Sequence, residues 1–350
     1  MATGTVPVRV GPGSVDVEGL TLREPRRLER ILGPEWARII YGLFSNRLSI
    51  AGMIIVLAFF LVAIFAPLLA PPLPGRDPTL IPRDGFGSQP KPPGTEWRSN
   101  SPPLPFWYTP LTGKDKWMHI LGTTSGQFDI WYGVIWGART ALFVGVLIVG
   151  LTVIFGVFVG SVAAYFGGWL DDVLMRITEI FMAFPFLLAA LTLASILVPL
   201  FGRGIWPAMI ALIVFGWMGY ARLVRSDILS VKERDYVMAA RVIGAKDSRI
   251  LMRHVLLNAI FPTLVLASLD IGSIVLAFAA LSFLGVGTDI GYADWGQIVS
   301  FARDWILTLD KTWWIVIYPG LALIFFGLGW NLIGDALRDI LDPKLRGARG

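Results

Sequence analysis

The sequence predicts an all-α membrane protein with six transmembrane helices, and two observations carry the prediction. Hydrophobic residues make up 55% of the 350-residue chain and charged residues only 16%, whereas soluble globular domains carry about 25% charged residues. The chain also contains six separate apolar blocks, each of about 20 residues or more, enough for a helix to cross a ~30 Å hydrocarbon core. Because backbone groups in lipid must be paired internally, we expect helices rather than isolated strands.

The predicted elements follow one another along the chain. The six apolar blocks lie at residues 48–70, 140–166, 173–198, 205–225, 258–285 and 312–334. The segment before the first block shows no sustained hydrophobic period, apart from a short amphipathic lead-in. We therefore divide the chain into a tail with its lead-in (1–47), a first transmembrane helix (48–70), a Pro-rich insert with the segment that follows it (71–139), a core of helices (140–337) that contains a basic loop (226–257), and a C-terminal tail (338–350).

Lysine and arginine set the expected orientation. With six spans, both termini lie on the same side of the membrane as the 226–257 loop. The two tails carry Arg9, Arg23, Arg26, Arg27, Arg30, Arg38, Arg47, Arg338, Lys344, Arg346 and Arg349. The short loops of the other side hold only Arg203, Arg303 and Lys311. Basic segments next to spans stay in the cytoplasm. The 71–139 segment also contains Lys and Arg, but loops of this length translocate largely regardless of charge. We expect a multi-pass protein of the cell inner (plasma) membrane with both termini cytoplasmic.

Two local patterns concern packing rather than chemistry. Small residues recur at every fourth position in Gly156, Gly160, Ala164 and Gly168, a stripe that lets helix backbones approach closely, so we predict bundle packing there. Adjacent carboxylates at 171–172 could form a paired-carboxylate site, but they follow a Gly-Gly-Trp turn at a span end. We interpret them as a solvated cap.

The sequence offers no basis for catalysis. It has no cysteine and only two histidines, His119 and His254, which argues against thiol chemistry and a His-rich metal site. No G-x-x-x-x-G-K-[ST], H-E-x-x-H or G-x-S-x-G motif occurs, so the chain is not expected to split ATP by itself. We predict no catalytic residue, no metal site and no cofactor.

One basic, amphipathic stretch interrupts the apolar blocks: YVMAARVIGAKDSRILMRHVLLNAIFP, residues 236–262. On composition alone it suits a membrane-surface helix held by anionic lipid and a docking segment for an acidic partner equally well. Its Ala239-Ala240 pair, followed by Gly244, resembles the cytoplasmic EAA loop of ATP-binding-cassette (ABC) importer permeases. In that family the loop forms a short coupling helix that docks onto the nucleotide-binding subunit.

Further segments resemble the dipeptide/oligopeptide branch of these permeases. LGTTSGQFDIWYGVIWGART (121–140) matches its entry segment, and GYARLVRSDILSVKERDYVMAARVIGA (219–245) its approach to the coupling helix. FPTLV (261–265), LSFLGVG (281–287) and NLIGDALRDILDPK (331–344) also match. The resemblance covers about residues 121 to 344.

The resemblance implies a type I ABC importer permease fold and a permease subunit that forms half of the pathway for peptides or similar solutes. Oligosaccharide or nickel import by the same branch is an alternative, and a secondary transporter is a rival from another class. The implied partners are a second permease, two ATP-binding subunits, an extracytoplasmic solute-binding protein and membrane lipid, but no nucleic acid. The residues expected to couple to the ATPase are Asp235, Ala239, Ala240, Arg241, Gly244, Ala245, Arg249 and Arg253.

The chain departs from the family pattern in several places. Met238 stands where the coupling loop has Glu, and Phe278 where the fifth span often has Glu. Asp270 lies about two turns earlier, so we consider two roles for it: a charge in the translocation pathway, or a carboxylate hydrogen-bonded to a neighbouring helix. The outer insert is longer than the branch suggests, and its Pro-rich and aromatic composition fits a protein contact or a plain loop equally well.

Overall fold

The computed structural model describes residues 16–17, 20–21, 34–99 and 101–341. Five helical segments in this part are long and apolar enough to cross a membrane: α3 (Arg47–Leu69), α5 (Ile130–Phe166), α8 with α9 (Ile205–Gly216 and Met218–Val231), α13 (Phe261–Phe283) and α16 (Trp314–Leu341). A sixth span is formed if the bent pair α6 (Gly168–Met182) and α7 (Phe186–Phe201) is counted as one. Each of the six predicted blocks falls on one of these segments.

The third predicted span is broken rather than straight. Helices α6 and α7 meet at 87° across a short break. Pro185 precedes α7 with extended backbone angles (φ −57°, ψ 119°). Proline lacks the amide that a continuing helix needs and disfavours helical geometry in the residue before it. The proline therefore explains why the helix stops at Met182 and starts again in a new direction.

Helix α5 is longer than predicted and runs through the centre of the bundle. It spans 37 residues and begins at Ile130, ten residues before the predicted start of the span at 140. Asp129 caps it by accepting a hydrogen bond from the backbone amide of Tyr132 at 2.8 Å. At 1.5 Å per residue the helix is about 55 Å long, well beyond a ~30 Å hydrocarbon core, so α5 extends into the aqueous layers.

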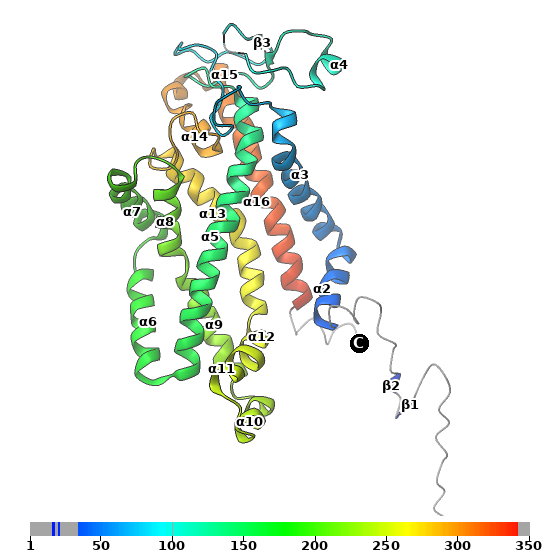
Figure 1. Cartoon of the computed structure of the whole chain (residues 1–350), viewed down its shortest axis with the longest axis vertical. Coiled ribbons are helices and arrows are strands. Elements are labelled where there is room, and N and C mark those ends of the chain that lie inside the picture. Colours follow the sequence, from blue (N-terminus) through cyan, green and yellow to red (C-terminus); the bar gives the residue numbers. More distant parts are fainter. Residues whose placement is uncertain (1–15, 18–19, 22–33, 100, 342–350) are drawn as a thin grey trace, which may run out of the picture.

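The helices pack around α5 as Figure 1 shows, with α3 and α16 on one side and α6 to α9 on the other. The predicted small-residue packing is confirmed at two glycines. A Cβ on Gly156 would lie 2.6 Å from the carbonyl oxygen of Trp217, the residue before α9, and one on Gly160 would overlap the carbonyl of Ala221 in α9. Gly168 differs, because it is the first residue of α6 and a Cβ there would meet nothing within 4 Å.

Shorter elements form a layer at each end of the bundle (Figure 1). One end holds the insert, with β3 (Thr95–Glu96) paired antiparallel to β4 (Met118–His119) and α4 (Tyr108–Thr112). The same end holds α14 (Trp295–Ser300), the 3₁₀ helix η2 (Arg303–Thr308) and α15 (Leu309–Thr312). The other end holds α10 (Asp235–Val242), α11 (Asp247–Ile250), the π-helix η1 (Leu251–Val255) and α12 (Leu256–Ala259).

The N-terminal lead-in is helix α2 (Pro34–Ser45), and a two-residue pair, β1 (Asp16–Val17) and β2 (Leu20–Thr21), precedes it. Much of both predicted tails lies outside the described residues. This includes the basic residues Arg9, Arg23, Arg26, Arg27, Arg30, Lys344, Arg346 and Arg349.

Candidate functional site

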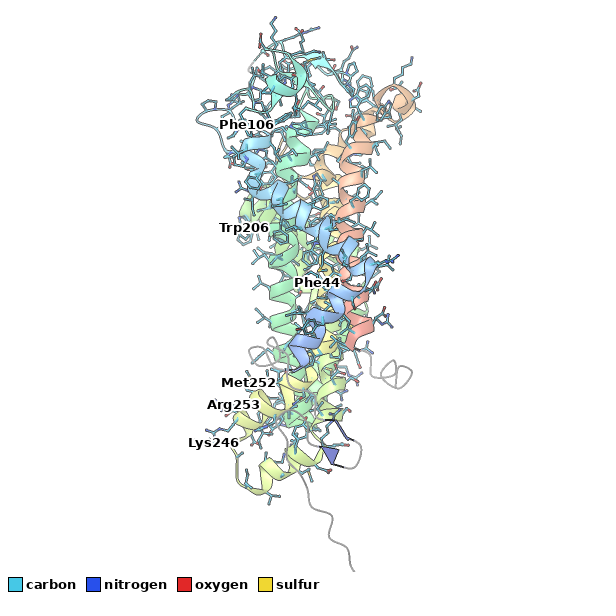
Figure 2. All side chains as sticks on the ribbon, turned by 90° about the vertical axis from the view of Figure 1, so that its right-hand side faces the viewer. Phe44, Phe106, Trp206, Lys246, Met252 and Arg253 are labelled. Atoms are coloured by element: carbon cyan, nitrogen blue, oxygen red, sulfur yellow. The ribbon has the colours of Figure 1, made fainter. Side chains whose placement is uncertain are left out.

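The predicted coupling segment lies at the end of the bundle opposite the insert. Figure 2 shows Lys246, Met252 and Arg253 together near this end, while Phe106 of the insert lies near the other. Helix α10 begins at Asp235, whose charge suits the first turn of a helix. It ends before Gly244, whose φ of 79° is the left-handed geometry that glycine adopts at least cost. The chain then turns into α11.

The inward face of this segment packs against α9. Val237, Ile250 and Val255 are fully buried in a cluster with Val224 and Ile228 of α9. A packed cluster of this kind transmits displacement, because protein interiors have low compressibility.

Polar contacts add a second connection, to the end of α5. Lys232 donates to the carbonyl oxygen of Ala164 at 2.9 Å, and the hydroxyl of Tyr165 donates to Asp247 at 2.7 Å. The guanidinium of Arg241 lies 5.7 Å from the centre of the Tyr165 ring. The end of α5 is therefore fixed to both α10 and α11.

The two alanines of the predicted coupling pair lie in different surroundings, and the coupling role of Ala240 stays a prediction. We expected both alanines of the pair to permit close approach of a partner, but only Ala239 is exposed. Ala240 is 7% exposed and packs in the chain's own cluster. Adjacent positions on a helix lie 100° apart. The two alanines therefore lie on different faces of α10, and here one is exposed while the other is buried. Ala240 thus allows α10 to approach its own bundle.

The outward face is apolar at its tip and basic around it. Val242 and Ile243 are 86% and 82% exposed, just before the Gly244 turn. The other exposed members of the predicted site are Asp235, Ala239, Arg241, Gly244, Arg249 and Arg253, and Ala245 is half-buried. Adjacent exposed apolar side chains next to charged ones are a feature of protein or membrane contact sites.

Asp270 has a partner within the bundle. The hydroxyl of Tyr220 in α9 donates to the Asp270 carboxylate in α13 at 2.6 Å. Phe278, the residue that replaces the family's Glu, is buried. Of the two roles considered for Asp270, the structure shows the hydrogen bond to a neighbouring helix. The role in the translocation pathway stays a prediction.

A charged cavity between α6 and α9 was not predicted from the sequence. It has a volume of about 680 Å³ and is lined by Asp172, Met175, Arg176, Glu179, Arg222, Arg225 and Ser226. The two carboxylates at 171–172 differ: Asp172 is exposed, as a solvated cap would be, whereas Asp171 is half-buried. Asp171 accepts two hydrogen bonds of 2.6 Å from the Arg225 guanidinium, and Asp172 lines the cavity. The sequence signal that could have indicated this cavity is the i, i+4, i+7 spacing of the charged residues 172, 176 and 179, which places them on one face of a helix.

A second charge cluster, which is buried, lies in the insert. The ring of His119 contacts Asp129 through Nδ1 at 2.7 Å and Asp84 through Nε2 at 3.1 Å, and Lys91 pairs with Asp84. Burial opposes ionisation of Asp84, but hydrogen bonds from Lys91, His119 and two backbone amides outweigh it and hold the pKa of this carboxyl below its usual range. Asp129 is also the cap of α5, so the cluster fixes the insert to that helix. Within the part of the chain that the structure describes, no group of three or more His, Asp or Glu residues is arranged to hold a metal ion.

Long apolar helices, a broken span and a projection at one end of the bundle are the features of a polytopic membrane protein. The family model described as binding-protein-dependent transport system inner membrane component matches residues 153–347. The model of the N-terminal transmembrane domain of oligopeptide transport permease C matches residues 35–90. The chain belongs to the family of binding-protein-dependent transport system inner membrane components, and it is a multi-pass inner-membrane permease with a type I ABC importer permease fold.

Curated relatives cover most of the chain. The dipeptide transport system permease protein DppC of Alkalihalophilus pseudofirmus is 34% identical over 311 residues, which is 89% of this chain and 90% of that protein. DppC of Bacillus subtilis is 33% identical over 86% of this chain and 83% of its own length. The oligopeptide permease OppC of B. subtilis is 33% identical over 89% and 90%. Among solved structures, an inward-facing MetNI methionine ABC transporter covers 60% of this chain and 97% of its own, with 18% identity and a TM-score of 0.49.

Proposed function

We propose that this chain is one of two different permease subunits of an ATP-driven peptide importer, and that it is itself non-catalytic. Hydrolysis occurs in two ATP-binding subunits, and an extracytoplasmic solute-binding protein delivers the cargo. Membership of a binding-protein-dependent family supports the partner types. The dipeptide and oligopeptide permeases among its relatives support the cargo class. Both termini lie in the cytoplasm, as the basic tails favour.

The observation that carries this proposal is the α10–α11 projection. It offers an exposed apolar tip with basic neighbours, and it is bonded to the end of α5 through Lys232, Tyr165 and Arg241. In the proposed mechanism, Asp235, Ala239, Arg241, Gly244, Ala245, Arg249 and Arg253 contact the ATP-binding subunit, while Ala240 holds α10 against the bundle. Closure of the ATP-binding subunits displaces α10, and the packed cluster carries that displacement to α5 and α9 as the bundle alternates its access.

Co-purification tests the interface. Val242→Glu combined with Ile243→Glu places two carboxylates on the apolar tip, where a contact would have to desolvate them, so the ATP-binding subunits should be lost from the purified complex. Leu307→Glu is the matched control, because Leu307 is exposed and apolar but lies in η2 at the other end of the molecule. Full retention of the ATP-binding subunits by the double variant, with normal transport, would show that the tip is not the contact.

A further inference from the structure

Residues 104–116 of the insert carry large apolar side chains that the rest of the described chain leaves uncovered. Phe106 and Leu111 are 73% and 77% exposed, and Leu104 is also exposed. Exposed apolar side chains that lie close together in the chain are a feature of surfaces that contact a protein or a membrane. The position of this segment relative to the bilayer shows which of the two it meets.

The indole of Trp107 fixes the depth of the segment. Its Nε1 donates to the carbonyl oxygen of Leu68 at 3.2 Å, and the indole of Trp131 donates to the next carbonyl, that of Leu69, at 3.2 Å. Helix α3 ends at Leu69 after 23 residues, which makes it about 35 Å long, close to the ~30 Å of the hydrocarbon core. The end of α3 therefore marks the membrane boundary, where tryptophan is enriched, and Trp107 lies at that boundary.

The segment lies beside the bundle as well as at its end. Figure 1 shows α4 farther from the bundle axis than the upper end of α3, and Figure 2 shows Phe106 at the level where the insert meets α3. The buried Tyr108 of α4 packs against Trp117, with 4.6 Å between ring centres. This contact holds α4 to the insert, while Leu111 stays exposed. Because the headgroup layer adds about 5–7 Å to each side of the core, the membrane beside α3 meets the segment at headgroup depth.

Two lysines follow α4 in the same segment. Lys114 and Lys116 are both exposed. Lys114 contacts the sulfur of Met118 at 2.9 Å, and neither lysine forms an ion pair with a carboxylate in the part of the chain that the structure describes. Lysine binds phosphate as a point charge, and a basic surface with apolar neighbours is attracted to the membrane interface. The charge of the segment therefore fits lipid headgroups, as its apolar side chains fit the layer below them.

We propose that residues 104–116 form an interfacial anchor in the leaflet next to the insert, with Phe106 and Leu111 entering the lipid and Lys114 and Lys116 binding lipid phosphates. Apolar side chains of an interfacial segment reach about 5–10 Å into the boundary between headgroups and acyl chains. The anchor fixes the height of the insert over the bilayer and assigns this aromatic segment to lipid rather than to a partner protein. It goes beyond the proposed function and does not depend on the cargo.

Site-directed fluorescence tests the anchor. The chain has no cysteine, so Leu111→Cys can carry a single bimane label in the purified complex, reconstituted in nanodiscs of phosphatidylcholine and phosphatidylglycerol. Phe86→Cys is the control, because Phe86 is 85% exposed and connects through Arg83 to Phe128, which precedes the start of α5. A lipid with a nitroxide near its headgroup should quench about half or more of the emission at position 111, and a nitroxide near the end of the acyl chain should quench less. The label at position 86 should respond to iodide in the water and to neither lipid.

A second pair of variants tests the lysines. Lys114→Gln with Lys116→Gln, added to the labelled Leu111→Cys chain, should raise iodide quenching at position 111 about twofold, because the segment loses its attraction to phosphate. Arg98→Gln is the matched control, since Arg98 is an exposed basic residue of the insert outside the segment. Iodide quenching at 111 that equals quenching at 86 would show a free loop, and a label shielded from both iodide and nitroxide would show a protein contact. Either result removes the anchor, and unchanged quenching in the double-lysine variant removes the phosphate contact.

Discussion

Replacing His119 by Leu should loosen the insert from the bundle. The side chain is fully buried, and both ring nitrogens contact carboxylates, at 2.7 Å for Asp129 and 3.1 Å for Asp84. Leucine fills similar space beside the Trp97 ring, whose centre is 4.4 Å from that of the histidine, but it provides no donor. Asp84 keeps Lys91 and two amides, whereas Asp129 keeps only the Tyr132 amide. Leaving a buried acceptor without its hydrogen-bond partner costs about 1–3 kcal/mol, and more for a charged group such as the Asp129 carboxylate.

Hydrogen exchange measures this cost locally. The amides of Gly94 and Trp97 donate to the carbonyls of His119 and Trp117, so they report opening of the insert. A loss of about 3 kcal/mol should speed their exchange roughly 100-fold, since each 1.4 kcal/mol is a factor of ten. Amides in α13 should not change. His254→Leu is the control, because His254 is the other histidine of the chain and lies in η1 at the opposite end. Exchange at Gly94 and Trp97 that stays within threefold of the parent would refute the reasoning.

Two further predictions concern the outer layer and the helix packing. Burial raises the pKa of Asp294 to about 6, so its stabilising contribution is complete below about pH 4 and is lost as the pH rises through 6, a difference of roughly 3 kcal/mol by pH 8. Asp294→Asn should make the melting temperature of the purified protein less dependent on pH between 5 and 8, and an unchanged dependence would contradict this. Gly160→Ala should destabilise the bundle by about 1–3 kcal/mol, because the new methyl would overlap the backbone of α9. Gly150→Ala in the same helix meets nothing within 4 Å and should be neutral or slightly stabilising, so equal melting temperatures for the two variants would exclude the close contact.

The sequence predicted the spans because hydrophobicity over about 20 residues is a local property. The ends and bends of these spans were harder to predict. The break at Pro185 was visible only as a proline inside an apolar block, and the early start of α5 depends on the Asp129 cap, which is one polar residue among many in that region.

The motif in the sequence predicted where a coupling segment would lie, and that role stays a prediction; the direction of its side chains could not be predicted. Which alanine of the pair faces inward depends on how α10 packs against Ile228 and Val224, and those contacts are distant in sequence. The same limit applies to Arg225, which contacts Asp171 across 54 positions, and to Tyr220, which contacts Asp270 across 50. Pairs of this kind are set by the tertiary fold, and one sequence contains no signal for them.

The contacts of α5 explain how the two ends of the molecule can be linked. At its start, Asp129 joins the helix to His119 and so to the insert. At its end, Tyr165 joins it to Asp247 and so to the coupling segment. Between these ends, Gly160 presses it directly against the backbone of α9, the helix that carries the cavity arginines. A continuous 37-residue helix has no internal break at which a displacement could be absorbed. Movement of the coupling segment must therefore shift the cavity wall and the insert together, unless one of these three contacts gives way.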